Sequence, residues 1–388
     1  MSVSRRLFFA RAGALAAAQG LVLKAQQTPP AQSSGSPAPG RGGSGPTYGK
    51  IDPRAGTHDI AKQYNYSDRR AKVALIKGDD RRKNVYEALV AIDDQIRPAL
   101  RAKKYVLIKP NGPDPRRDGD LGWSKGDAMH GILDYLAARF KGPVVVAEQG
   151  SVPAMQAVSE YGWNGIFAEH KPLDIKLEFP NEEGQYGLMY GIDYDMHPIP
   201  IRLVARFLDP AAFVISSSVM KTHNVVVATL SIKNVVMGSP LRPPPGSNRV
   251  YAESETRKFH VGIRASNLNM YLAFQRMLPN WGVGLIDGFE GMEGNGPASG
   301  TPVPHRIALA STDFLAADRV GVECMGIDAG WLGYLNYAYQ GGLGQYDLAK
   351  IDVVGTKIAE VQRKYRLHAD FDRMLDWQGP MKDLPQTL

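Results

Sequence analysis

The sequence predicts an α/β fold, with a mostly parallel sheet, flanking helices and some added antiparallel strands. Short runs rich in Val and Ile alternate along the chain with longer segments whose apolar residues recur at helical spacing. The apolar runs are nearly continuous, which is typical of parallel strands that are buried on both faces. The chain is 44% hydrophobic and 22% charged, which is ordinary for a soluble globular protein.

The first half of the expected domain alternates strands with helices. We expect strands at 72–78, 104–111 and 143–150. Amphipathic patterns predict a helix over 85–100 and another over 128–140. Right-handed crossovers between parallel strands would bring the carboxyl ends of these strands to one edge of the sheet.

The second half is less regular. Polar alternation predicts antiparallel strands or a small subdomain at about 170–210. The Pro-rich segment 240–248 is expected to be a surface loop. The remaining elements are expected strands at 212–221, 283–288, 306–311 and 351–355, and expected helices at 313–325 and 356–365.

The N-terminus has the layout of a twin-arginine export signal. Arg5 and Arg6 precede two phenylalanines and a weakly hydrophobic, Ala-rich segment that ends near Leu23. A membrane anchor is the alternative, but the apolar segment is shorter than the roughly 20 residues that span a bilayer. We therefore expect a signal peptide over 1–27, with the twin-arginine export machinery as a partner and no stable membrane anchor in the mature form.

The export signal also predicts where the protein works and where its folded part begins. Residues 28–50 are rich in Pro, Gly and Ser and are expected to form a linker, because they cannot bury enough apolar surface to fold. One α/β domain is then expected over 51–388. The mature chain is expected to be periplasmic, or otherwise outside the cytoplasm of a bacterium.

Charge and cysteine content exclude two classes of function. The formal net charge is +7, but residues 1–50 hold six Lys or Arg and no Asp or Glu, which leaves about +1 for the rest of the chain. We therefore expect no nucleic-acid partner. The single cysteine, Cys324, excludes an iron–sulfur cluster ligated by this chain alone.

Chemically active side chains follow four of the expected strands. In open α/β sheets, ligands bind beyond the carboxyl ends of the strands, so these positions are the first candidates for a site. The side chains are Lys109 and Asn111, Glu148, Lys221 and His223, and Asp287.

The segment after the fourth expected strand contains a second polar pair. Lys221 and His223 are two residues apart, so both point to the same side of an extended chain. Lys233 and Asn234 would lie on a helix, with Lys233 near its carboxyl end, although a strand over 225–232 remains possible.

These residues together predict a positively charged pocket for a carboxylate or phosphate. Taken alone, each lysine is also consistent with a surface position, and His223 with a buried, hydrogen-bonded histidine. In the pocket, His223 is the expected general acid/base, since its usual pKa lies near neutral pH, and Lys221 is its expected catalytic neighbour. The expected substrate-binding residues are Lys109, Asn111, Lys233 and Asn234.

Acidic residues give a weaker prediction of a divalent metal. Asp287, Glu290 and Glu293 fall in the glycine-dense stretch 287–300, which is expected to be a loop, and with Asp318 they offer oxygen ligands for magnesium or calcium. A tight, solvated turn is the alternative. Asp318 lies in an expected apolar helix and needs a partner, for which a strand-end lysine is a candidate.

The motifs resemble those of the DUF362 family, a group of proteins of unknown function. The resemblance implies an α/β fold and one shared site, and it adds His260 to the expected substrate-binding residues. Some relatives carry ferredoxin-type cysteine motifs, which this chain lacks. The matching segments are VLIKPN (106–111), MKTHNVVVATLSIKNVVMG (220–238), KFH (258–260), LIDGFEGMEGNGPASG (285–300) and ALASTDFLAADRVG (308–321).

Three functions are compatible with these patterns. The first is an exported enzyme that acts on a small anionic ligand, with or without a divalent metal. The second is a non-catalytic extracytoplasmic protein that binds a metal or an anionic metabolite. The third is a structural envelope protein whose lysines are only solvated. The residues leave open whether the site is catalytic, and they leave the cofactor unassigned.

Overall fold

A computed structural model describes residues 68–112, 120–148, 162–244, 254–278 and 281–378. All of them lie within the unit Ile51–Leu388. The expected signal peptide and linker, and the part of the Pro-rich segment from residue 245 onward, lie outside the described residues.

The main sheet is mostly parallel, as the sequence predicts. Along the sheet, only β11 runs antiparallel to its neighbours, β1 and β9. Two short strands, β8 and β10, extend the sheet by antiparallel pairing with β7 and β9. The order is β12 (Ile351–Gly355), β1 (Ala71–Lys77), β11 (Ile307–Ser311), β9 (Trp281–Asn295), β7 (Ala212–His223), β2 (Tyr105–Pro110), β3 (Val144–Ala147) and β4 (Ile175–Glu178), with β8 at Val227–Thr229 and β10 at Ser299–Val303.

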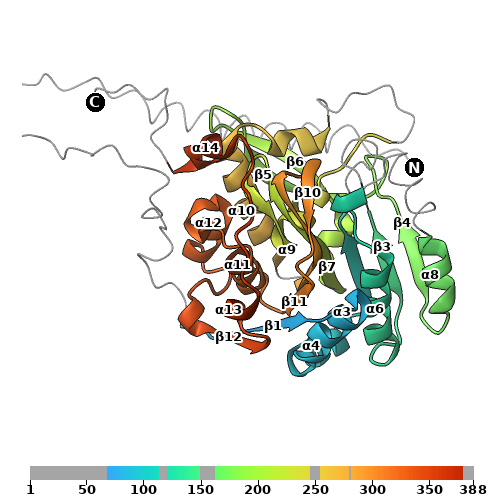
Figure 1. The fold of residues 1–388 in the computed structure, drawn as a ribbon. Helices are drawn as coiled ribbons and strands as arrows, with labels where there is room; N and C mark the ends of the chain where they lie inside the picture. The colour runs from blue at the N-terminus through green and yellow to red at the C-terminus, as the bar shows by residue number, and fades with distance from the viewer. Residues whose placement is uncertain (1–67, 113–119, 149–161, 245–253, 279–280, 379–388) are drawn as a thin grey trace, which may run out of the picture. The chain divides into compact units, whose positions relative to one another are not determined.

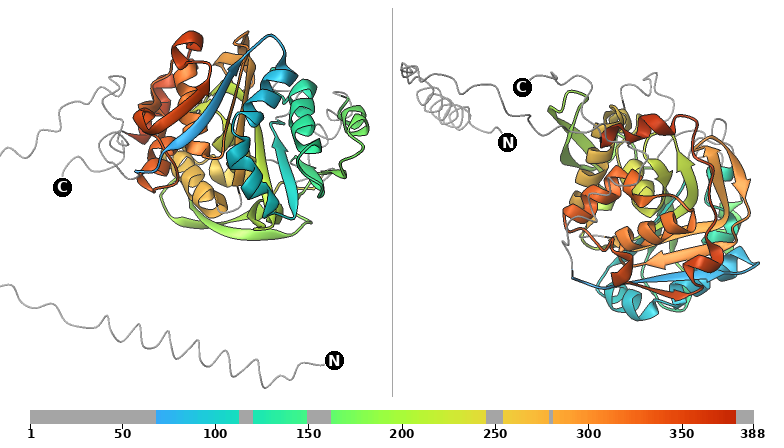
Figure 2. Two further views of the ribbon diagram at one scale, coloured as in Figure 1. Left: turned by 90° about the horizontal axis from the view of Figure 1, so that it is seen from below. Right: turned by 60° about the vertical axis from the view of Figure 1, so that its left-hand side comes forward.

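Helices cover both faces of this sheet and enclose a separate apolar core on each side (Figures 1 and 2). Alternate residues of each strand enter opposite cores: in β2, Val106 and Ile108 enter one and Leu107 the other. One core is covered by α3 (Arg81–Val90), α4 (Asp93–Arg101), α6 (Gly126–Ala137) and α8 (Trp163–Glu169). The other is covered by α9 (Ser231–Gly238), α10 (Ile263–Met277), α11 (Phe314–Cys324) and α12 (Gly333–Gln340).

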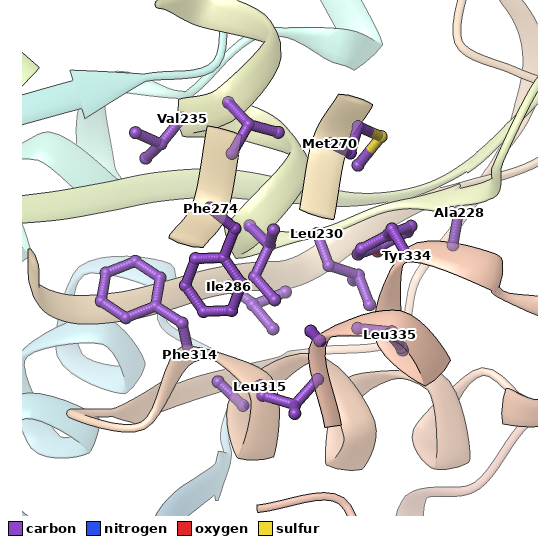
Figure 3. Close-up of a cluster of buried hydrophobic side chains, with 14 of the residues drawn as sticks. Ala228, Leu230, Val235, Met270, Phe274, Ile286, Phe314, Leu315, Tyr334 and Leu335 are labelled. Atoms are coloured by element: carbon purple, nitrogen blue, oxygen red, sulfur yellow. The ribbon is translucent and has the colours of Figure 1, made fainter. Parts of the chain in front are cut away.

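The second core contains large aromatic and aliphatic side chains from distant parts of the chain. Figure 3 shows Phe274 of α10, Ile286 of β9 and Phe314 of α11 within one cluster. All three are almost completely buried. Burial of this kind is the main favourable contribution to folding, and here it attaches α10 and α11 to the sheet.

Antiparallel strands do occur within 170–210. β5 (Tyr186–Ile192) and β6 (Pro198–Val204) form a separate two-stranded sheet in which Met189 pairs with Ile201. The earlier strand of this region, β4, instead joins the edge of the main sheet in parallel with β3. Three of its four residues are partly buried and one is exposed, which suits a strand at the edge of a sheet.

Three elements differ from the sequence prediction. The helix expected over 85–100 is divided into α3 and α4 near Ile92, whose backbone has φ −121° and ψ 21°. The glycine-dense stretch 287–300 is a hairpin of β9 and β10 rather than a loop. The helix expected over 356–365 is reduced to α13 (Ile358–Val361), because Arg363 and Tyr365 donate backbone hydrogen bonds to the end of α11 and the residue after it.

None of the helices in the described part of the chain is long and apolar enough to cross a membrane. The remaining helical segments are short: α14 (Phe371–Met374) and the 3₁₀ turns η1 (Asp120–Gly122), η2 (Ala205–Leu208), η4 (Glu255–Phe259), η6 (Ala329–Trp331), η7 (Leu348–Lys350) and η8 (Leu375–Trp377).

Candidate functional site

An open cavity of about 690 Å³ lies at the carboxyl ends of β2, β3 and β7. Helix α9, turn η4 and the turn between β9 and β10 complete its walls. The cavity therefore lies where an open α/β sheet is expected to bind its ligand. It brings together all seven residues that the sequence assigns to catalysis or substrate binding: Lys109, Asn111, Lys221, His223, Lys233, Asn234 and His260.

Lys109 forms a buried ion pair with Glu148 across the ends of β2 and β3. Its Nζ lies 2.6 Å from Glu148 Oε2, and both side chains are only 3% exposed. Burial lowers the pKa of Lys109, while the nearby carboxylate opposes this shift. Gly238 of α9 makes room for the lysine, because a Cβ at that position would lie 2.2 Å from Lys109 Cε. This lysine is thus held in one place by its neighbours.

Lys221 and His223 enter the cavity from the end of β7. Lys221 is 1% exposed, and its Nζ donates a hydrogen bond to the Gly122 carbonyl at 3.2 Å. His223 Nδ1 accepts a hydrogen bond from the Val225 amide at 3.0 Å, so the proton of the neutral ring lies on Nε2. Burial, and then the positive charge of Lys233, hold the pKa of His223 well below its usual value. His223 is therefore neutral at neutral pH.

Helix α9 is fixed by Asp318 at its N-terminus. Asp318 Oδ1 accepts hydrogen bonds from the Ser231 amide at 2.8 Å and from Ser231 Oγ at 2.5 Å, and Oδ2 accepts one from the Ile232 amide at 3.1 Å. Burial raises the pKa of Asp318 to about 7, although these hydrogen bonds oppose the shift. The prediction that Asp318 pairs with a strand-end lysine is therefore wrong: its carboxyl group accepts hydrogen bonds from the start of α9.

The start of α9 places Lys233 and Asn234 in the cavity wall. The helix begins at Ser231, so Lys233 lies in its first turn and not near its carboxyl end as the sequence predicts. Asn234 Nδ2 donates hydrogen bonds to the Lys109 carbonyl at 2.9 Å and to Ser216 Oγ at 3.1 Å. Asn234 thereby connects α9 to β2 and β7.

His260 follows η4 and has the opposite tautomer to His223. Its Nδ1 lies 3.1 Å from the Thr256 carbonyl, which can only accept, so Nδ1 carries the proton and Nε2 the lone pair of the neutral ring. Burial lowers the pKa of His260 to about 4, and the positive charge of Lys233 adds to this effect. The cavity thus contains one neutral imidazole that donates through Nε2 and one that accepts through it.

Several buried polar atoms of the cavity wall find no hydrogen-bond partner among the residues that the structure describes. Thr229 Oγ1, Asn234 Oδ1, Thr256 Oγ1 and Asn111 Oδ1 make no hydrogen bond within the described part of the chain. Buried polar groups are normally satisfied by protein, ordered water or ligand. Water or a ligand with its own donors is therefore expected to occupy this cavity.

The cavity wall is strongly positive. Among the described residues of the wall, Lys109, Lys221, Lys233 and Arg242 are cationic, against the single carboxylate of Glu148. Cationic side chains that converge in a partly water-excluded space favour an anion, and Lys and Arg are the usual ligands of carboxylate and phosphate groups.

The four carboxylates expected to hold a metal do not come together. Asp287 lies within β9 and pairs with Arg81 of α3, with 3.2 Å between Oδ2 and Nε. Glu293 accepts a hydrogen bond from the Arg366 amide at 2.9 Å, and Asp318 caps α9. Glu290 is half-buried in β9.

The geometry therefore does not fit a single metal centre at these four positions. Within the described residues, no three of the four bring ligand atoms into mutual range, and the only such acidic cluster is Asp193, Asp195 and His197 in the β5–β6 turn. Asp287 does not end its strand, because β9 continues to Asn295, and it lies opposite Val219 of β7 in the sheet.

Sequence reasoning missed several residues of the cavity wall. Arg242 belongs to the Pro-rich segment that the sequence predicts to be only a surface loop, and Thr256 lies in η4. Neither position has a periodic signal. Glu148 was recognisable, because it follows a strand, but its role as the partner of Lys109 depends on the pairing of β2 with β3.

Comparisons with known proteins agree with the resemblance seen in the motifs. No curated protein matches the chain. One similar solved structure is the crystal structure of a Thermotoga maritima protein from a structural genomics programme, with 12% identity, a TM-score of 0.32, and coverage of 58% of this chain and 55% of that one. The family DUF362, described as a domain of unknown function, matches residues 106–323, which is more than half of the chain. The chain therefore belongs to the DUF362 family.

Proposed function

We propose that this protein is an exported enzyme that binds a small anionic substrate, a carboxylate or a phosphate, in the cavity at the ends of β2, β3 and β7. The observation that carries the proposal is the set of four cationic side chains that face this cavity beside one carboxylate. The export signal in the sequence supports a location outside the cytoplasm.

The burial of the lysines supports an anionic ligand. Burying a charge costs free energy unless a partner compensates it. Glu148 compensates Lys109, and a bound anion would add compensation for Lys221 and Lys233. Thr229 and Thr256 would donate their hydroxyl hydrogens to the same ligand, since their oxygens make no hydrogen bond within the described residues.

The two histidines support proton transfer with divided roles. His223 offers an N–H through Nε2, which suits hydrogen bonding to an oxygen that gains negative charge. His260 offers the lone pair of Nε2, which suits a general base. A bound anion would raise the low pKa of His260 toward the working pH. In this proposal His260, rather than His223, accepts the proton.

Thermal shift and calorimetry with phosphate, sulfate, succinate and citrate test anion binding. Lys221→Met and Lys233→Met are expected to weaken binding of the best anion at least about tenfold, since each removes a charged hydrogen-bond donor. Lys83→Met is the matched control, because Lys83 is an exposed lysine of α3 that does not line the cavity. Unchanged binding in both cavity variants would contradict the proposal.

A binding protein without catalysis is the second candidate. The observation in its favour is the low pKa of both histidines, which keeps both rings neutral near neutral pH. Incubating the protein with a ligand that stabilises it, followed by mass spectrometry, separates the two functions. An enzyme converts the ligand, and His260→Asn abolishes conversion while binding persists. A binding protein returns the ligand unchanged.

A further inference from the structure

A second hollow of about 570 Å³ adjoins the cationic cavity. The two hollows share three wall residues, Asn224, Val225 and His260. The second hollow is otherwise formed by the turn between β5 and β6, the start of α10 and the segment around α14. A ligand that fills both hollows therefore passes beside His260.

The charges of the two hollows differ. The second hollow has two arginines, Arg264 and Arg373, and three aspartates, Asp195, Asp370 and Asp376. Positive charge thus dominates in the first hollow, whereas negative side chains slightly outnumber positive ones in the second. An anionic group is favoured in the first hollow and disfavoured in the second.

Apolar side chains also line the second hollow. Tyr194 and Met196, in the β5–β6 turn, are 64% and 36% exposed, and Val261 and Ile263, just before and at the start of α10, line the same hollow. The large exposed apolar residues of the described chain are concentrated on this hairpin, with Val90 as the exception. Exposed apolar groups that line a hollow are one mark of a ligand-binding groove.

We infer that the substrate has two parts: one anionic end that lies in the cationic cavity, and an apolar alkyl or aryl group that lies in the second hollow. This inference rests on the proposed function, because it uses the same cavity for the anionic end. The bond that changes is placed at the junction of the two hollows, next to His260.

Calorimetry with two homologous series tests this inference on the full-length protein. The series are methyl, butyl and hexyl phosphate, and acetate, butyrate and hexanoate, all below their critical micelle concentrations. Burial of apolar groups is worth up to about fourfold in affinity per methylene. In the series that binds, the longest member is expected to bind at least about tenfold more tightly than the shortest member.

Two variants of the hairpin locate the apolar part. The double variant Tyr194→Ser/Met196→Gly removes two side chains that line the second hollow. Glycine suits the left-handed backbone of Met196, whose φ is 67°. It is expected to lose most of the chain-length gain and to bind the shortest member as the wild type does. Tyr190→Ser is the matched control, because Tyr190 is 67% exposed on the same hairpin and is not part of the hollow.

The outcomes separate this inference from the proposed function. If the shortest member binds but affinity does not rise with chain length, the two-part substrate is wrong and anion binding stands. If the gain is the same in the double variant and in Tyr190→Ser, the second hollow is not where the apolar group lies, and the inference is again wrong. If no member of either series binds, both the inference and the proposed function fail.

Discussion

At the scale of single residues, the chemistry of the cavity depends on groups whose titration is shifted by burial. Lys109, His223 and His260 all have lowered pKa values because the protein removes them from water, and neighbouring positive charges deepen the shift for the two histidines. Asp318 is shifted upward for the same reason. The shift of His260 is expected to make anion affinity depend on pH, and that of Asp318 to make the free energy of unfolding depend on pH.

Anion binding is expected to take up protons. The pKa of His260 is about 4 in the ligand-free cavity, so the ring is neutral at pH 6, and a bound anion raises this pKa. Affinity for sulfate, whose own charge is constant between pH 5 and 8, is therefore expected to increase as the pH falls. Calorimetry at pH 6 in buffers with different ionisation heats should show uptake of up to about one proton per sulfate.

The control for proton uptake is another histidine. His260→Asn is expected to reduce the uptake, whereas His197→Asn should leave it unchanged, since His197 is exposed in the β5–β6 turn and lies outside the cavity. Sulfate binding without proton uptake in the wild type would contradict the role given to His260.

Asp318 is expected to make stability fall as the pH rises. Its pKa is about 7 in the folded protein and 3.8 as the ordinary value, so between these values the folded chain holds a proton that the unfolded chain releases. The free energy of unfolding of the wild type relative to Asp318→Asn should therefore fall by at most about 4 kcal/mol between pH 4 and 7. Urea denaturation across this range measures the difference.

An exposed carboxylate provides the comparison for Asp318. Asp174→Asn, next to β4, removes a carboxylate that is 60% exposed, and the same urea measurements on this variant give the baseline. A wild-type advantage over Asp318→Asn that grows with pH would show that the hydrogen bonds from α9 outweigh burial, which is the reverse of the expected sign.

At the scale of elements, α9 determines how the cavity is built. Its first turn supplies Lys233 and Asn234, its N-terminus is capped by Asp318 of α11, and its last residue, Gly238, packs against Lys109 of β2. Helix α9 therefore links the main sheet to the cavity wall. Substitutions at either end of α9 are therefore expected to move the cationic side chains of the cavity.

Gly238→Ala is expected to weaken anion binding. The new methyl group would lie 2.2 Å from Lys109 Cε and 3.0 Å from Nζ, so the lysine must move away from Glu148. Overpacking of this kind typically costs about 1–3 kcal/mol of stability. Thermal unfolding and titration with the best anion measure both effects.

Gly165→Ala is the matched control for Gly238→Ala. Gly165 also lies in a helix, α8, but a Cβ there would meet no heavy atom within 4 Å. Alanine is favoured over glycine in a helix by up to about 1 kcal/mol, so this variant should be at least as stable as the wild type. Equal behaviour of the two variants would show that Lys109 is not confined by α9.

The sequence predicts elements well where apolar periodicity is strong, and it predicts the site where polar residues follow strands. Lys109 and Lys221 were recognisable because parallel strands place their carboxyl ends together. The β9–β10 hairpin was not, because its glycines indicate a loop when read alone, although in the structure they allow close packing: a Cβ at Gly291 would lie 2.2 Å from Tyr365 Oη. The pairing of Asp287 with Arg81 depends on how α3 packs on the sheet, which no local pattern contains.

At the scale of the whole molecule, most of the net positive charge lies in residues 1–50, and the rest of the chain is nearly neutral. The residues after position 50 carry a formal charge of about +1, yet one cavity gathers four cationic side chains and one carboxylate. The attraction for an anion is therefore local to the cavity rather than a property of the protein surface. The cavity residues that the structure describes all come from the unit Ile51–Leu388, so anion binding should not need residues 1–50.

Replacing the twin arginines separates export from binding. Arg5→Lys/Arg6→Lys keeps the charge of the leader but removes the arginine pair on which the predicted export signal depends. In a bacterial host that has the twin-arginine export machinery, fractionation followed by immunoblotting should find the variant in the cytoplasm and the wild type outside it. The purified variant should bind anions as the wild type does, because the substitutions lie outside the unit that forms the cavity.

Two outcomes would contradict these expectations. Export of the variant at the wild-type level would contradict a twin-arginine signal. Loss of anion binding would show that residues 1–50 contribute to the site.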